Sequence, residues 1–381
     1  MTPPPDAPPA SWWAARARSG RLPDIPWDTI ADEAALARAH PGGVVDLSVG
    51  TPVDSAPEVV QRALAEAADA PGYPTTLGTA ALRESAARWL ARRLGADADP
   101  ATEVLPTIGS KELVAWLPTL LGLGSGDVVV VPELAYPTYE VGARLAGAEP
   151  VRSDAMTALG PRRVALVWVN SPSNPTGRVL PPEHLAKVVA WARERGALVV
   201  SDECYVELGW TERPVSVLHP DVCGGSHEGL LAVHSLSKRS NLAGYRAGFV
   251  AGDASVVGAL LEARKHAGLL VPAPVQAAMA AALDDDTHVT RQRARYSARR
   301  DLLLAALREA GFRVDHSEAG LYLWATRDEP CRQTLRWLAE RGILVAPGEF
   351  YGPTGARHVR VALTAPDERV EAGCARLTAP V

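Results

Sequence analysis

The feature that most constrains the fold of this 381-residue chain is an alternation of short β-branched runs with amphipathic helical segments, from Val44 to about Asp284. Within Pro182–Arg195, apolar residues recur at helical spacing, and Gly196 follows as a stop. Strands separated by helices favour an α/β fold, with a mostly parallel sheet and helices on both of its faces. The strand-like runs are Val128–Val131, Val164–Val169, Ala197–Ser201, Leu230–His234 and Arg246–Ala251.

The pattern changes at the acidic run Asp284–Asp286, which we interpret as a hinge. Beyond it we expect a long arginine-rich helix, one further helix and three short strands, which together form a smaller α+β unit. At about 150 residues per domain, the length fits a flexible tail and arm over residues 1–45 (the arm joining the small domain), a large domain over 46–284 and a small domain over 285–381. The expected elements are helices Thr287–Ala310 and Arg332–Arg341 and strands Phe312–Val314, Leu321–Ala325 and His358–Leu363.

The N-terminal region has two parts. Met1–Ala10 is proline-rich and lacks the basic start and apolar core of a signal peptide, so we treat it as a flexible tail. The arm Ser11–His40 contains Trp12, Trp13 and Trp27, and aromatic residues on such an arm are expected to cover another surface of this subunit or of a partner.

Composition excludes several classes of protein. A total of 39 Lys+Arg against 44 Asp+Glu leaves a net charge of −5, which disfavours nucleic-acid binding, and the arginines of 291–300 are expected on a solvated helix surface. No run of about 18 uncharged apolar residues predicts a membrane span. The four cysteines form no CxxC pair, which predicts reduced thiols and a cytoplasmic location. The histidines show no HExxH or HxH pattern, so we predict no metal site.

The chain uses arginine almost everywhere in place of lysine. Any chemistry that requires an ionisable amine is therefore restricted to a small set of side chains. The four lysines are Lys111, Lys187, Lys238 and Lys265.

Polar side chains follow three successive strand-like runs. Asn174 follows the first of the three, Asp202 and Tyr205 follow the second, and Lys238 follows the third behind two serines. Each has an ordinary explanation on its own: a turn for Asn174, a helix cap for Asp202, and an exposed position for Lys238. Because the carboxyl ends of parallel strands meet at one edge of a sheet, their joint occurrence favours a shared ligand site.

With these residues the chain resembles the fold-type I, pyridoxal phosphate (PLP)-dependent class I/II aminotransferases. The order and spacing of four motifs match the family, and the resemblance extends from Val44 to Leu377. It implies the PLP-dependent transferase fold and transaminase activity. The motifs are Asn170-Ser-Pro-Ser-Asn174-Pro-Thr-Gly177, Asp202-Glu-Cys-Tyr205, Ser235-Leu-Ser-Lys238 and Gly244-Tyr-Arg246.

The resemblance implies a role for each residue around the cofactor. Lys238 would hold PLP as a Schiff base and then move the proton between substrate Cα and cofactor C4′. Asp202 would pair with the pyridinium N–H, which keeps the ring able to accept electrons. Asn174 and Tyr205 would hydrogen-bond the 3-oxygen of the ring, and Tyr136 matches the aromatic residue that stacks on the ring face.

The same resemblance places the cofactor phosphate. Gly109–Glu112 follows the strand-like run Val104–Thr107 and opens a predicted helix, Ser110–Leu121, whose free N–H groups suit an anion. Tyr73 matches a tyrosine that the family contributes across a dimer interface, which implies a homodimer with a shared active site. The other residues expected at the phosphate are Ser110, Lys111, Ser235, Ser237 and Arg246.

Three matches concern the substrate. Arg360 matches the arginine that binds the α-carboxylate, for which a guanidinium offers two parallel donors. Gly50 matches a backbone element that closes over the substrate, and Asn174 also borders it. The sequence does not show which arginine would bind a distal carboxylate.

Several stretches, including Gly72–Thr76 and His234–Phe249, are similar to one branch of the family, the actinobacterial N-succinyldiaminopimelate aminotransferases of lysine biosynthesis. That branch implies transfer of an amino group from glutamate to N-succinyl-2-amino-6-oxopimelate. An aminotransferase for aspartate or aromatic amino acids and a C–S β-lyase stay open on the same fold. A PLP-binding regulator would need a DNA-binding module, for which the roughly 40 residues before the catalytic-like body are too few.

Overall fold

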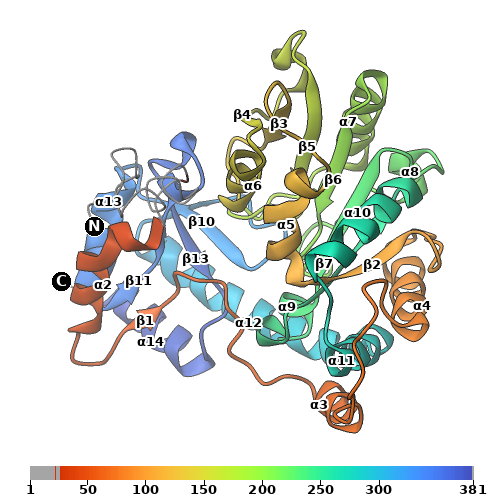
Figure 1. The fold of residues 1–381 in the computed structure, drawn as a ribbon. Coiled ribbons are helices and arrows are strands. Elements are labelled where there is room, and N and C mark those ends of the chain that lie inside the picture. Colours follow the sequence, from red (N-terminus) through yellow and green to blue (C-terminus); the bar gives the residue numbers. More distant parts are fainter. Residues whose placement is uncertain (1–21, 23–25, 380–381) are drawn as a thin grey trace, which may run out of the picture.

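A seven-stranded sheet forms the centre of the larger body in the computed structural model, which describes residues 22 and 26–379 (Figure 1). The predicted tail, Trp12 and Trp13 lie outside the described residues. The strand order is β2-β8-β7-β6-β5-β3-β4. The strands are β2 (Val104–Ile108), β3 (Val128–Val131), β4 (Glu149–Arg152), β5 (Val164–Asn170), β6 (Leu198–Asp202), β7 (Leu230–Ser235) and β8 (Ala247–Gly252).

The prediction of a mostly parallel sheet is confirmed, with β8 as the exception. Strands β4, β3, β5, β6 and β7 pair in parallel, whereas β8 runs antiparallel to both of its neighbours, β7 and β2. The cause is the short connection from Ser235 to Ala247, which contains only α9 (Leu236–Arg239) and η5 (Ala243–Tyr245). A parallel return needs a crossover of about a dozen or more residues, usually with a full helix.

Helices cover both faces of this sheet, as predicted. Successive residues of one strand enter different cores: Val199 packs in the core with α4, α7 and α11, and Val200 packs in the core with α5, α6 and α10. Burial on both faces explains why the strands are continuous apolar runs. The predicted helix Pro182–Arg195 is observed as α7, and Gly196 ends it with a φ of 64°. The other five helices are α4 (Ala80–Trp89), α5 (Gly109–Leu120), α6 (Thr138–Ala146), α10 (Ala254–Ala267) and α11 (Ala273–Asp284).

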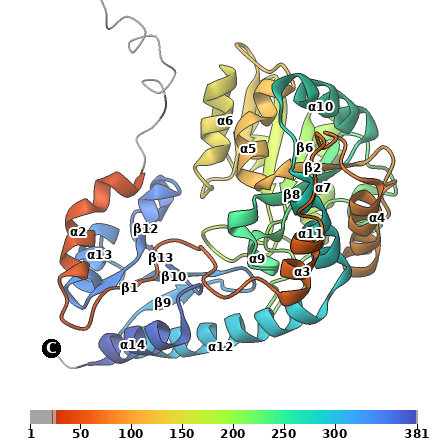
Figure 2. The same ribbon diagram turned by 60° about the horizontal axis from the view of Figure 1, so that its bottom comes forward.

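The second body contains a small antiparallel sheet, ordered β12-β13-β10-β9, and the long helix α12 (Thr287–Glu309), which runs beneath both bodies (Figure 2). The parallel pair β1 (Val45–Asp46) and β11 (Ile343–Leu344) joins the N-terminal segment to it. Its remaining elements are η2 (Pro26–Ile30), α2 (Ala31–Arg38), β9 (Arg313–Asp315), β10 (Tyr322–Thr326), α13 (Cys331–Glu340), β12 (Ala346–Pro347), η6 (Gly348–Phe350), η7 (Pro353–Gly355), β13 (Val359–Ala362) and α14 (Asp367–Thr378). Short helices elsewhere are α3 (Glu58–Glu66), η3 (Leu90–Leu94), η4 (Met156–Leu159) and α8 (Pro220–Cys223).

The division into domains at residues 45 and 284 stays a prediction, and the cores support it. Ile30, Ala37 and Val45 pack in one core with residues of β10, α13 and α14, apart from the two cores that flank the large sheet. Every helix among the described residues is too short or too polar to cross a membrane.

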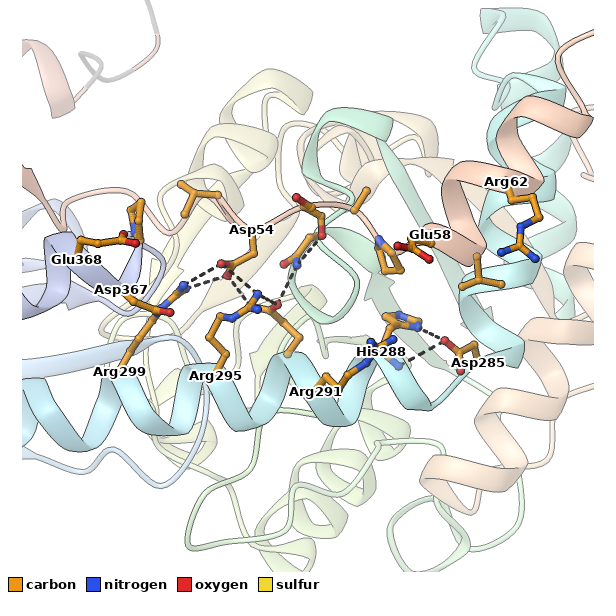
Figure 3. A pocket seen from close by; sticks show the side chains of 18 residues that line it. Asp54, Glu58, Arg62, Asp285, His288, Arg291, Arg295, Arg299, Asp367 and Glu368 are labelled. Carbon is orange, nitrogen blue, oxygen red and sulfur yellow. Dashed lines mark hydrogen bonds and ion pairs between the residues drawn. The ribbon is translucent and has the colours of Figure 1, made fainter.

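A strap of residues 47–57 connects β1 to α3, and Asp54 anchors it to α12 (Figure 3). Arg299 donates to both carboxylate oxygens of Asp54 at 2.8 Å and to Asp367 at 2.6 Å, and Gln292 donates to Asp54 at 2.7 Å. Burial raises the pKa of Asp54, but the bonds from Arg299 and Gln292 outweigh this and bring the pKa below its ordinary value. These residues line a charged cavity of about 720 Å³ and hold the strap in place.

Candidate active site

A pocket of about 680 Å³ at the carboxyl edge of the large sheet contains almost all the predicted site residues. Tyr73 is the exception: its side chain is 99% exposed and does not line the pocket. The structure thus brings the successive strand ends together in one pocket, while the ligand and the role of each residue stay predictions. The pocket is lined by Gly50, Ser110, Lys111, Tyr136, Asn174, Asp202, Tyr205, Ser235, Ser237, Lys238, Arg246 and Arg360, among others.

The ends of β5 and β6 are joined by Asn170. Its amide donates to the carbonyl oxygen of Asp202 at 2.9 Å, and its side-chain oxygen accepts from the backbone N–H of Asn174 at 2.7 Å. One buried side chain therefore fixes the loop that presents Asn174 against the strand that ends in Asp202.

Asp202 is a buried carboxylate, and no cation among the described residues pairs with it. Its oxygens accept from the backbone N–H of Cys204 at 3.2 Å and from the hydroxyl of Tyr139 at 2.8 Å. Burial raises the pKa of Asp202, partly opposed by these hydrogen bonds. A cationic N–H group placed in the pocket would reverse this, since an opposite charge favours the ionised carboxylate.

Lys238 is half-buried and directs its amine into the pocket, where it donates to the carbonyl oxygen of Gly50. Of the other lysines, only Lys111 lines the pocket; Lys187 lies on α7, and Lys265, on α10, pairs with Glu262 at 2.6 Å. An amine that could form a Schiff base with a carbonyl group bound in this pocket is therefore that of Lys238 or Lys111.

One end of the pocket suits an anion. The N-terminus of α5 lies there with Ser110 and the exposed Lys111, which has no ion-pair partner among the described residues. Arg246 lies nearby and donates to a carbonyl oxygen of Ala243, not to a carboxylate. A side chain on Gly109, whose φ is 69°, would overlap the guanidinium of Arg246, so glycine is required for this close approach.

Arg360 lies on β13, lines the same pocket and is 4% exposed. It donates to Asn174 Oδ1 at 2.9 Å and to the carbonyl oxygen of Ser48 at 2.6 Å, and it pairs with no carboxylate in the described part of the chain. Its Nε has no hydrogen-bond partner. A buried guanidinium with unused donors fits a substrate carboxylate.

Sequence reasoning did not identify several residues of the pocket. Tyr139 bonds Asp202 and stacks on Trp168, with ring centroids 4.8 Å apart. These residues carry no motif of their own, and only the spacing of Tyr139, three residues after Tyr136 at the start of a helix, could have indicated that both face the site. The other unpredicted residues of the pocket lining include Trp27, Arg152, Tyr322, Phe350 and Tyr351.

The residues present fit PLP. A buried carboxylate without a cation suits the ring N–H, an amine can bond the aldehyde carbon, and a cradle of glycine, serine and two cations suits the phosphate. The fold and the site thus define a PLP-dependent transferase.

Comparisons with known proteins give the family. Residues 42–377 match the model of aminotransferase class I and II. The chain is 68% identical over 368 residues to the probable aminotransferase Rv1178 of Mycobacterium tuberculosis, covering 96% of this chain and 88% of that one. It is 61% identical over 357 residues to the 4-dedimethylamino-4-oxo-anhydrotetracycline transaminase OxyQ of Streptomyces rimosus, covering 94% and 99%.

Among solved structures, N-succinyldiaminopimelate aminotransferase from Mycobacterium tuberculosis superposes with a TM-score of 0.82 at 30% identity, covering 92% of this chain and 96% of that one. The chain belongs to the class I and II aminotransferases and is a PLP-dependent transaminase.

The account of Asp202 predicts a specific loss of activity. Asp202→Asn should fold normally but lower turnover by about 10- to 150-fold, because a hydrogen bond to a charged group contributes about 1.5–3 kcal/mol. Steady-state kinetics on the PLP-loaded variant measures this effect, and the melting temperature checks folding.

The matched control is Glu203→Gln, the next carboxylate along the chain. Glu203 is 1% exposed, accepts from the backbone N–H of Val217 at 2.7 Å, and does not line the pocket; burial raises its pKa to about 7. Its turnover should stay within about threefold of wild type, a difference below about 1 kcal/mol. Near-normal turnover in Asp202→Asn would contradict the pairing of Asp202 with the cofactor ring.

Proposed function

We propose that the pocket transfers an amino group from glutamate to an oxo-acid acceptor, with the predicted residues in the predicted roles. When bound, PLP supplies the electron sink for the carbanion at the substrate Cα. Lys238 would move the proton at that carbon, and Asp202 would hold the ring nitrogen protonated. Tyr205 and Asn174 would orient the ring, and Arg360 would bind the α-carboxylate.

For the acceptor, we propose N-succinyl-2-amino-6-oxopimelate, which would be converted to N-succinyl-LL-2,6-diaminopimelate with release of 2-oxoglutarate, a step of lysine and diaminopimelate biosynthesis. The observation that carries this proposal is a guanidinium in the pocket wall in addition to those of Arg246 and Arg360. Arg152 binds Glu140 at 2.9 Å and the carbonyl oxygens of Tyr351 and Glu133, and its side chain is one-quarter exposed. A distal carboxylate of the acceptor could take the place of Glu140 at Arg152. The structural similarity to N-succinyldiaminopimelate aminotransferase from Mycobacterium tuberculosis gives further support.

A second candidate is a bulky ketone that bears aromatic rings. Aromatic side chains form much of the pocket wall, and Trp27 packs edge-on against Phe350 with ring centroids 5.3 Å apart. Such a wall suits stacking against a flat acceptor. The relative OxyQ is named for a transaminase of a tetracyclic ketone. Transamination of aspartate or aromatic amino acids and C–S β-elimination are the remaining alternatives.

An acceptor screen separates these candidates. With glutamate as donor, the succinylated oxopimelate should be aminated at least about tenfold more efficiently than a polycyclic ketone, oxaloacetate or phenylpyruvate, a difference of about 1.4 kcal/mol. Arg152→Met should raise the KM for this acceptor about tenfold or more, since a hydrogen bond to a charged group is lost. Arg144→Met is the matched control, because Arg144 binds the same Glu140 at 2.7 Å but does not line the pocket.

Preference for the polycyclic ketone, or an unchanged KM in Arg152→Met, would contradict the assignment of the acceptor. Release of pyruvate and ammonia from a cysteine conjugate, without amination of any oxo acid, would favour the lyase.

We further propose a homodimer in the cytoplasm. A tyrosine ring that is 99% exposed leaves a large apolar surface uncovered, which favours contact with a second copy of the chain. In that dimer Tyr73 would reach the phosphate end of the partner's pocket. The four free cysteines support a reducing compartment.

Mixing two inactive variants tests whether the active site is shared. If Tyr73 acts across the interface, exchange of subunits between Tyr73→Ala and Lys238→Ala creates one complete site in each mixed dimer. Turnover should then rise to about a quarter of the wild-type rate, because about half of the dimers are mixed and each has one intact site of two. No gain after subunit exchange, or a fully active monomer, would contradict the proposal.

A further inference from the structure

Tyr322 lies where three of the predicted site residues meet. It is the first residue of β10, is 4% exposed, and pairs with Ala362 of β13, the strand that carries Arg360. Its side chain contacts Tyr205 and Arg360, and it lies against the backbone of Gly50. No motif singled out this residue, although it lines the pocket.

The contact with Tyr205 is a hydrogen bond between two phenols. Their oxygens are 3.1 Å apart, and their rings meet at 76° with centroids 5.7 Å apart. Each hydroxyl has a single proton. If Tyr205 donates its proton to the 3-oxygen of the cofactor, Tyr322 has to be the donor of the pair.

The charges around Tyr322 favour this direction. Burial raises the pKa of its phenol, but the positive charges of Arg360 and Lys238 outweigh burial and bring the pKa below its ordinary value. The pKa of Tyr205 lies well above its ordinary value, chiefly because of burial. The more acidic phenol is the better donor, and donation to Tyr205 in turn strengthens the bond that Tyr205 makes.

The contact with Arg360 is a stack. The guanidinium carbon lies 3.9 Å from the centroid of the Tyr322 ring, and the Tyr351 ring lies at 4.9 Å. Aromatic faces attract the buried cation without occupying its N–H edge, whereas a protein carboxylate would compete with the substrate for that edge. The stack therefore orients the guanidinium without using its N–H donors, of which two bond Asn174 and Ser48 and that of Nε has no partner.

The third contact explains the glycine of the strap. A methyl group on Gly50 would overlap the Tyr322 hydroxyl and lie 2.7 Å from its Cζ, so the backbone crosses the edge of the ring. Gly50 is therefore required by the space that Tyr322 occupies. Its carbonyl oxygen also accepts from Lys238, so both residues hold the strap over the pocket.

We propose that Tyr322 is a positioning residue that links the arginine for the substrate carboxylate to the tyrosine for the cofactor 3-oxygen. Its hydroxyl acts through Tyr205, and its ring face acts through Arg360. The proposal rests on the proposed roles of those two residues, and it assigns the hydroxyl and the ring to separate effects.

Two substitutions separate these effects in the PLP-loaded enzyme. Tyr322→Phe removes the hydroxyl and keeps the ring. The pH midpoint of the visible absorbance of the Lys238-linked cofactor should rise by at least about 0.3 unit. The hydrogen bond from Tyr205 to the 3-oxygen becomes weaker, so the 3-oxygen carries more negative charge and holds the proton on the neighbouring Lys238 nitrogen more tightly. Tyr322→Leu also removes the ring face that stacks on Arg360. In the reaction of the PLP-loaded enzyme with glutamate alone, it should therefore also raise the half-saturating glutamate concentration about tenfold or more.

A double-variant comparison shows whether the hydroxyl acts through Tyr205. In a Tyr205→Phe background, Tyr322→Phe should leave the pH midpoint unchanged, since the bond from Tyr205 to the 3-oxygen, which the Tyr322 hydroxyl strengthens, is already absent. Tyr296→Phe is the control for loss of a buried phenol: Tyr296 lies on α12, outside the pocket lining, and donates to Asn241 at 3.3 Å. It should alter the melting temperature only.

These experiments distinguish a wrong role for Tyr322 from a wrong acceptor or donor in the proposed function. Both readouts use PLP and glutamate without an acceptor, so an incorrect acceptor does not affect them. If wild type does not react with glutamate, the donor assignment fails, and the pH midpoint still tests Tyr322. An unchanged midpoint in folded Tyr322→Phe, or the same shift with and without Tyr205, would overturn the role of the hydroxyl. Unchanged glutamate saturation in Tyr322→Leu would overturn the role of the ring.

Discussion

The structure depends most on a single negative charge, the carboxylate of Asp202 at the end of a central parallel strand. It is buried, and hydrogen bonds from Tyr139 and Cys204 are its only observed compensation among the described residues. Burial of an unpaired charge is costly, so a fold retains it where a ligand supplies the opposite charge. The pyridinium of PLP is such a ligand, and the side chains arranged around Asp202 suit the rest of the same molecule.

The residues proposed to hold the cofactor and the arginine proposed to bind the substrate carboxylate come from different parts of the chain. Asp202 ends β6 of the large sheet, and Asn174 and Lys238 follow β5 and β7, whereas Arg360 lies on β13. Their alignment depends on contacts between the two bodies, among them the bond from Arg360 to Asn174 and the strap that Asp54 ties to α12.

The sequence predicted those features that depend on local pattern. The bounds of β3 and α7 agree with the expected segments, because each is a continuous apolar run or a capped amphipathic helix. Lys238, Asp202 and Asn174 could be found because each follows a strand and the topology gathers strand ends. The antiparallel β8, Tyr139, Tyr322 and the Asp54–Arg299 pair could not, since each depends on chain connection or on contacts between residues distant in sequence.

The central claim is that Lys238 is the residue that bonds the cofactor, and one chemical labelling experiment tests it most directly. Reduction of the PLP-loaded enzyme with borohydride fixes the cofactor to its lysine through a stable C–N bond, and peptide mass mapping locates the added phosphopyridoxyl group. The account predicts the label on the peptide that contains Lys238 and none on Lys111, the other lysine of the pocket. A label on Lys111, or no label on Lys238 in an enzyme that shows the cofactor absorbance, would contradict it.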